Sequence, residues 1–87
     1  MRLGQLLMTR GAIAAFQDVA EGPGSYIVRH AKGDWGNVCE EDKRLNDRAL
    51  ERDERVLSSY ELSDGTEVWI ITEWDRSATT LLLPIEY

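Results

Sequence analysis

Few side chains in this sequence could do chemistry, and its only histidine is the first to consider. His30 lies on the apolar side of a predicted short helix, and Asp34 follows it four residues later. An imidazole beside a carboxylate can transfer protons, but covalent catalysis also needs a nucleophile, and only Cys39 and Ser77 remain as candidates. The sequence has no nucleophile elbow, phosphate-binding loop or pair of histidines at metal-ligand spacing. We therefore predict that His30 packs in the interior, that His30 and Asp34 form at most a small polar site, and that the chain holds neither a metal nor a cofactor.

A second polar group surrounds the last predicted turn. Glu73, Asp75 and Arg76 lie within four residues of one another, at the edge of a predicted sheet. They could form a polar site, but aspartate two residues before Ser77 is also typical of a turn whose carboxylate accepts a backbone hydrogen bond. We predict that Asp75 stabilises the turn in this way and that the turn is exposed.

The charge of the chain argues against several classes of function. Its 87 residues include 16 acidic and 10 basic side chains, so the formal net charge is −6. Proteins that bind nucleic acid concentrate Lys and Arg on one face, and anionic membranes also attract basic surfaces. We therefore expect no direct contact with nucleic acid or membrane, and we predict a protein partner with a basic surface. The candidate interaction surface consists of Glu40, Glu41, Asp47, Glu51, Asp64, Glu67, Glu73, Asp75 and Arg76.

Length and cysteine content limit the architecture. A chain of 87 residues is one domain, which we place at residues 1–87. A single cysteine excludes an intramolecular disulfide, and no apolar run reaches the length of a membrane span. We expect a cytoplasmic protein.

The periodicity of apolar residues predicts helices first and strands afterwards. Residues 3–8 form a short apolar run, which we read as a first strand or an extended arm. Thr9 and Ser25 are predicted N-caps of two helices, and Gly33 is predicted to end the second of them. The remaining elements are a helix over residues 39–51 and strands over residues 56–62, 68–71 and 79–83, with a hairpin turn at residues 63–65.

This order predicts an α+β fold in which N-terminal helices pack on one face of a C-terminal three-stranded antiparallel meander. The other face of the sheet would expose either Trp69 and Ile71 or Val68 and Ile70. An open sheet face or edge favours self-association, so a homodimer is an alternative or additional partner. Core filling is the expected role of at least two of the three tryptophans.

Several short motifs together resemble a family of small "plasmid-related" proteins carried on plasmids, integrative elements and prophages. The motifs are Arg29-His30, Gly33-Asp34-Trp35-Gly36, Glu41-Asp42, Asn46, Ala49-Leu50, Trp69-Ile70-Ile71-Thr72-Glu73, Asp75-Arg76-Ser77, Thr79-Thr80, Leu82-Leu83-Pro84 and Glu86-Tyr87. Ile85 departs from the family pattern, in which a glutamate follows the proline. The resemblance covers nearly the whole chain but implies no activity and no site residue. What it implies is genetic context, because accessory genes of mobile elements often interfere with host defence.

Three functions follow from these observations. The first is a non-enzymatic, acidic interaction domain of a mobile genetic element that interferes with a host defence system, either restriction or CRISPR. The second is a small toxin-like ribonuclease, in which His30, Tyr60 and Arg76 would provide acid–base and phosphate-binding groups. The third is a homo-oligomeric structural or regulatory domain. The acidic charge favours the first and disfavours the second, since a ribonuclease must approach RNA.

Overall fold

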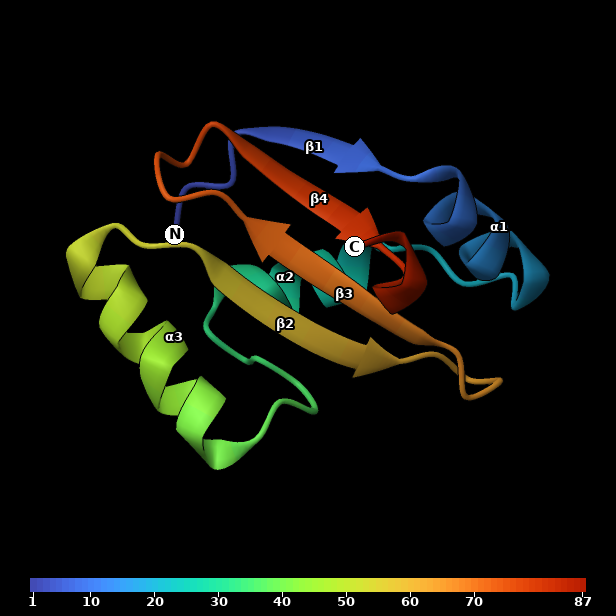
Figure 1. The fold of residues 1–87 in the computed structure, drawn as a ribbon. Helices are drawn as coiled ribbons and strands as arrows, with labels where there is room; N and C mark the ends of the chain where they lie inside the picture. Colours follow the sequence, from blue (N-terminus) through green and yellow to red (C-terminus); the bar gives the residue numbers. More distant parts are fainter.

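The computed structural model describes residues 1–87 as an α+β fold with a four-stranded mixed sheet (Figure 1). The elements in chain order are β1 (Gln5–Met8), α1 (Arg10–Asp18), α2 (Gly24–Ala31), α3 (Glu40–Arg52), β2 (Val56–Glu61), β3 (Glu67–Thr72), β4 (Ala78–Leu82) and a 3₁₀ turn, η1 (Pro84–Glu86).

The sheet corrects the prediction of a three-stranded meander. Its strand order is β1-β4-β3-β2; β2, β3 and β4 are the antiparallel meander, and β1 joins β4 in parallel. In this added pair, Gln5 lies opposite Ala78 and Met8 lies opposite Leu81. The short apolar run at residues 3–8 indicated a strand, but no local pattern indicates a partner so distant in the sequence.

The helix termini follow the local chemistry, with one correction. The hydroxyl of Thr9 accepts a hydrogen bond from the N–H of Ala12, which makes Thr9 the N-cap of α1 as predicted. Ser25 is not an N-cap, because α2 begins at Gly24 after Pro23, whose fixed φ already suits a helix start. Gly33 follows α2 at φ 85°, the left-handed conformation expected of a helix-terminating glycine. None of the three α-helices has the length and apolar character that crossing a membrane requires.

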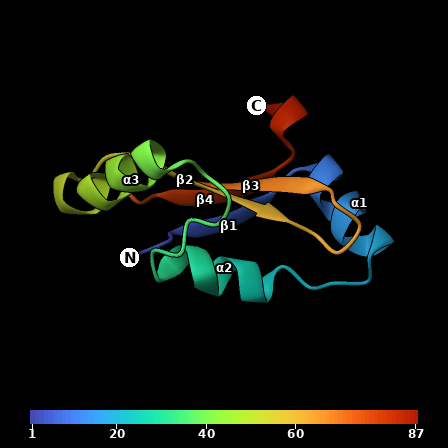
Figure 2. The same ribbon diagram turned by 90° about the horizontal axis from the view of Figure 1, so that it is seen from below.

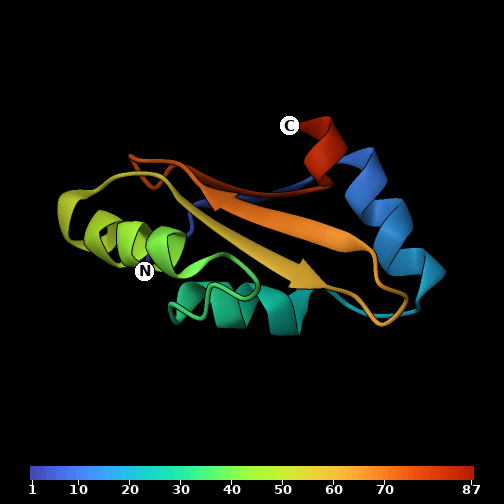
Figure 3. The same ribbon diagram turned by 60° about the horizontal axis from the view of Figure 1, so that its bottom comes forward.

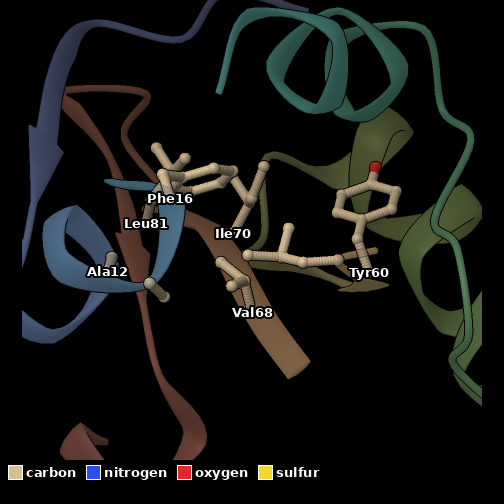
Figure 4. Close-up of a cluster of buried hydrophobic side chains, with 8 residues drawn as sticks. Ala12, Phe16, Tyr60, Val68, Ile70 and Leu81 are labelled. Carbon is tan, nitrogen blue, oxygen red and sulfur yellow. The ribbon is translucent and has the colours of Figure 1, made fainter. Parts of the chain in front are cut away.

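The main hydrophobic core lies between one sheet face and the first two helices (Figure 4). Ala12 and Phe16 of α1 pack with Val68, Ile70 and Leu81 of the sheet. Figure 2 shows α2 on this side of the sheet and η1 on the other. The face with Val68 and Ile70 is covered by helices. On the opposite face Trp69 is half-buried, but Ile71, which the sequence paired with Trp69 as exposed, is buried, so neither predicted pair is exposed.

The third helix does not share that face, contrary to prediction. Figures 2 and 3 show α3 beside β2, at the edge of the sheet. Its Ala49 packs with Trp35 and Val56 in a second, smaller cluster. Leu45 is exposed although it is apolar, and the side chain of α3 turned to the sheet is Asn46. The Asn46 amide donates to the carbonyl of Leu57 and accepts from its N–H, as a neighbouring strand would.

Candidate functional site

His30 is completely buried at the centre of a chain of polar side chains between α2 and the sheet. Its Nδ1 lies 2.5 Å from the hydroxyl oxygen of Ser58 on β2, and its Nε2 lies 2.8 Å from that of Thr72 on β3. Thr72 in turn bonds Thr79 at 2.8 Å, and the hydroxyl of Thr79 donates to the carbonyl of Leu3. The burial agrees with the sequence prediction.

The end of this chain determines the direction of the protons from Thr79 back to Nε2. The hydroxyl of Thr79 has one proton, which the carbonyl of Leu3 receives, so Thr79 accepts from Thr72. Thr72 then accepts from the Nε2–H of His30. Because burial lowers the pKa of His30, the imidazole is neutral near pH 7, so Nδ1 carries no proton and accepts from Ser58.

Burial lowers the pKa of His30 to about 4, and the nearby positive charge of Arg76 contributes. A second proton on Nδ1 would face the hydroxyl of Ser58 in a site that is closed to solvent, because both side chains are fully buried. With both nitrogens engaged inside the fold, the imidazole has no free position for a substrate.

Asp34 does not orient the imidazole, although the sequence suggested that it could. Its carboxylate pairs with the guanidinium of Arg29 at 2.7 Å, on the surface. Hydrogen bonds from Arg29 are the largest cause of the lowered pKa of Asp34. The polar site considered for His30 and Asp34 is therefore divided between the interior and the surface.

Arg76 has a structural position that the sequence did not indicate. It lies in the β3–β4 turn at φ 60°, and its guanidinium donates to the carbonyls of Glu73, Glu54 and Ala49. Two of these carbonyls lie at the C-terminal end of α3, where a positive charge is favoured. Asp75 accepts from the N–H of Ser77, as predicted, and the turn is exposed. Arg76 thus joins the turn to α3 and is not free to bind a phosphate.

A cavity of about 490 Å³ lies next to Arg76, between the ends of α2 and α3. Arg2, Lys32 and Arg76 line it together with Asp53, so it is locally positive. Three basic side chains around a cavity of this size do not provide the extended basic surface that a polynucleotide requires.

The negative charge is concentrated in the second part of the chain. Residues 1–52 contain eight acidic and eight basic side chains, whereas residues 53–87 contain eight acidic and two basic ones. Between Arg55 and Arg76 there is no basic residue at all. This interval holds β2, β3 and the turn between them, and it contains five acidic side chains, three of which (Glu61, Asp64 and Glu67) belong to the hairpin.

Three carboxylates gather at the end of this hairpin. Glu61 and Glu67 are directly opposite each other in the β2–β3 pair, and Asp64 lies in the turn that connects them. Glu67 accepts hydrogen bonds from the hydroxyl of Ser59 and from the indole N–H of Trp69. We call Glu61, Asp64, Glu67 and Trp69 the hairpin surface. Opposed like charges destabilise a strand pair unless a cation neutralises them, and the chain supplies none here.

A fourth carboxylate borders the hairpin surface. Glu21, in the α1–α2 connection, accepts from the N–H and hydroxyl of Ser63 and from the hydroxyl of Tyr26. These bonds, first of all the backbone N–H of Ser63, lower the pKa of Glu21 and so favour its charged form.

We expect the Glu61→Gln variant to be slightly more stable than the natural protein. Removing one of two opposed charges should raise the free energy of unfolding by about 0.2–0.5 kcal/mol at low ionic strength. The gain should diminish in about 0.5 M salt, which screens exposed charges. Urea unfolding followed by circular dichroism at both salt concentrations measures it, and a variant less stable at low salt would contradict the repulsion.

The structure divides the predicted interaction surface into separate groups. Glu40, Glu41, Asp47 and Glu51 are exposed on α3, but Lys43, Arg44, Arg48 and Arg52 are interleaved with them, and Asp47 accepts from the indole of Trp35. Asp64 and Glu67 lie at one end of the hairpin, whereas Glu73, Asp75 and Arg76 lie at the other, as Figure 1 shows for the two turns of β3.

Sequence reasoning missed Glu61, which the strand register places opposite Glu67. The turn at residues 63–65 was the available signal, because a short hairpin connection fixes which residues face each other. Cys39, a possible nucleophile by sequence, is exposed at the start of α3, away from the buried imidazole. No group of three or more histidine, cysteine or acidic side chains has an arrangement suited to a metal ion.

Fold and site together define a small α+β protein with an acidic hairpin. No family model, curated protein or solved structure matches the chain.

Proposed function

We propose that this protein is an acidic interaction domain, and that its hairpin surface binds a basic segment of another protein. The observation that supports this most is the opposition of Glu61 and Glu67 in a stretch without any basic residue. A Lys or Arg side chain from a partner would relieve the repulsion while forming charge-assisted hydrogen bonds. The repulsion between these carboxylates destabilises the free protein, and its relief by a partner would add to the free energy of binding.

Apolar side chains next to the carboxylates strengthen this proposal. The indole of Trp69 is half-buried on the sheet face opposite α2, next to η1, with the ring of Tyr87 packed edge-on at 5.6 Å. The turn η1, which contains Ile85, lies on this side of the sheet (Figure 2), and both Ile85 and Tyr87 are exposed. Tryptophan and tyrosine are enriched in interaction hot spots, and arginine stacks favourably on their rings, as Arg55 of this chain does over Tyr87 at 5.4 Å.

The partner we favour is a nucleic-acid-handling protein of a host defence system, of the restriction or CRISPR type. Such a protein must present Lys and Arg to phosphates, so it offers the surface that the hairpin complements. The resemblance of the chain to plasmid-related proteins of mobile elements supports this context. The same surface would repel DNA and RNA directly.

The ribonuclease alternative has less support. His30 and Tyr60 are both buried, and the hydroxyl of Tyr60 donates to the backbone carbonyl of Asp34. Arg76 is occupied by three backbone carbonyls. These three groups would have to leave their packed positions before any of them could contact RNA.

We expect the double variant Glu61→Gln/Asp64→Asn to lose affinity for a basic polypeptide. A fluorescently labelled octa-arginine peptide is the probe, with anisotropy measured at low and at physiological salt. Each amide keeps an acceptor oxygen but removes a charge, so the dissociation constant should rise about fivefold or more at low salt. The difference should shrink as salt is added.

The matched control is Glu40→Gln/Glu41→Gln on α3, which changes the net charge by the same amount at a place where basic residues are interleaved. It should bind the peptide nearly as well as the natural protein. Equal losses of affinity for the peptide in both variants would mean that binding depends only on the net charge and that the hairpin surface is not a docking surface. In host lysate, a true partner should be captured by the control and not by the hairpin variant.

A further inference from the structure

The two edges of the sheet differ in how their backbone groups are satisfied. On the outer side of β2, Asn46 bonds the N–H and the carbonyl of Leu57. The next outward-facing residue, Ser59, donates to the carbonyl of Trp35 and accepts from the N–H of Asn37. The α3 edge is therefore closed to another strand.

The β1 edge is open. Gln5 donates to the carbonyl of Ser77 and Thr9 donates to the carbonyl of Leu81, so the odd-numbered residues of this segment face β4. In a parallel pair of this register, the N–H and carbonyl groups of Leu6 and Met8 point away from the sheet. Figure 1 shows no element outside β1.

Nothing in β1 blocks the approach of another strand. Native proteins protect an edge with a very short strand, a charged residue, a proline or a bulge. The strand β1 is short, at four residues, but Gln5–Met8 contains no charge, proline or bulge, and Leu6 and Leu7 are 51% and 41% exposed. An uncharged, apolar and unprotected strand is a site for strand pairing.

We propose that β1 pairs antiparallel with β1 of a second copy of this chain, around a twofold axis at Leu7. In this register Leu6 of one copy exchanges two hydrogen bonds with Met8 of the second copy, and the symmetry repeats this pair. Leu7 faces Leu7 at the axis on the uncovered sheet face. The two sheets become one sheet of eight strands.

The pairing strand is uncharged, so a second copy can occupy this edge without placing like charges opposite each other in the two strands, although Arg2 and Arg10 flank the strand on each copy. No acidic residue precedes Asp18, whereas the acidic hairpin lies at the opposite edge of the sheet. A dimer joined through β1 thus holds the two hairpins at its far ends, and the net charge of −6 on each copy repels least. Because the β2 edges are closed by α3, the assembly ends at two copies. This inference does not depend on the proposed function.

A concentration series by analytical ultracentrifugation tests the proposal on the full chain. A pairing this short buries less than the roughly 1,200 Å² of a standard interface, so dimer should appear between about 10 µM and 1 mM protein. Leu7→Lys places two positive charges at the twofold axis and should raise the dissociation constant at least about tenfold. Val28→Lys, on an exposed position of α2, is the control and should dimerise normally.

Hydrogen exchange on the natural protein gives a readout that is independent of any variant. The amides of Leu6 and Met8 should become protected as protein concentration rises, whereas those of other exposed residues should not change. A monomer at all concentrations, or a dimer that persists in Leu7→Lys without protection of these amides, would overturn the proposal. If Leu7→Lys fails to fold, the exchange result alone decides.

Discussion

The Gly36→Ala variant is expected to lose at least about 3 kcal/mol of stability. Gly36 has φ 74°, which costs about 1–2 kcal/mol for a residue with a side chain. In addition, a Cβ there would overlap the carbonyl oxygen of Ser59 and lie 2.7 Å from the ring of Tyr60. The carbonyl cannot move away freely, because it accepts from the N–H of Asn37 at 2.7 Å. Thermal unfolding by circular dichroism should show a melting temperature lower by more than about 10 °C.

The matched control for this variant is Gly65→Ala in the β2–β3 turn. Gly65 also has a positive φ, 87°, but no atom lies within 4 Å of the place that a Cβ would occupy. This variant therefore carries the backbone penalty alone and should lose about 1–2 kcal/mol. Equal losses at the two positions would contradict the close approach of Gly36 to β2.

Acidification is expected to destabilise the protein well above the pH at which carboxylates titrate. The pKa of His30 is lowered from 6.5 to about 4 in the folded state, so the unfolded chain binds a proton more readily. The stability associated with the neutral imidazole is complete above pH 6.5 and is lost as the pH falls toward 4. With about 1.4 kcal/mol per pKa unit, the loss between pH 7 and pH 5 should be about 2 kcal/mol.

Urea unfolding measured at pH 7, 6 and 5 checks this prediction. Several carboxylates also have a lowered pKa, among them Glu21, Asp34 and Glu86. The stability that they contribute is lost mainly as the pH falls below about 4.5, so they contribute little to the change in stability between pH 7 and pH 5. His30→Gln removes the titrating group and is the control. It should be less stable at pH 7, because the polar chain is interrupted, but its stability should hardly change between pH 7 and pH 5. A similar slope in both proteins would exclude His30 as the cause.

The sequence predicted what local chemistry decides. Thr9 caps its helix, Gly33 ends the next one, and Gly65 supplies the positive φ of the hairpin turn, because each depends on residues within one turn of the chain. The burial of His30 also followed from its spacing on a helix face.

The long-range features could not be predicted in this way. Asn46 faces the sheet because it satisfies backbone groups of Leu57, and nothing near it in the sequence identifies that partner. Arg76 reaches α3 across an interval of more than twenty residues. For the candidate site, the composition showed that acidic side chains outnumber basic ones, but only the strand register places Glu61 opposite Glu67.

The parallel pairing of β1 with β4 has a consequence for how the chain is made. A ribosome delivers Gln5 well before Ala78, which lies opposite it in the sheet. Until Ala78 emerges, the β1 segment has no intramolecular strand to bind, and its leucines are available to chaperones or to neighbouring nascent chains. Closure of the sheet must therefore wait for β4, and slow synthesis of the residues between the two strands would prolong the interval in which this protein is prone to aggregate.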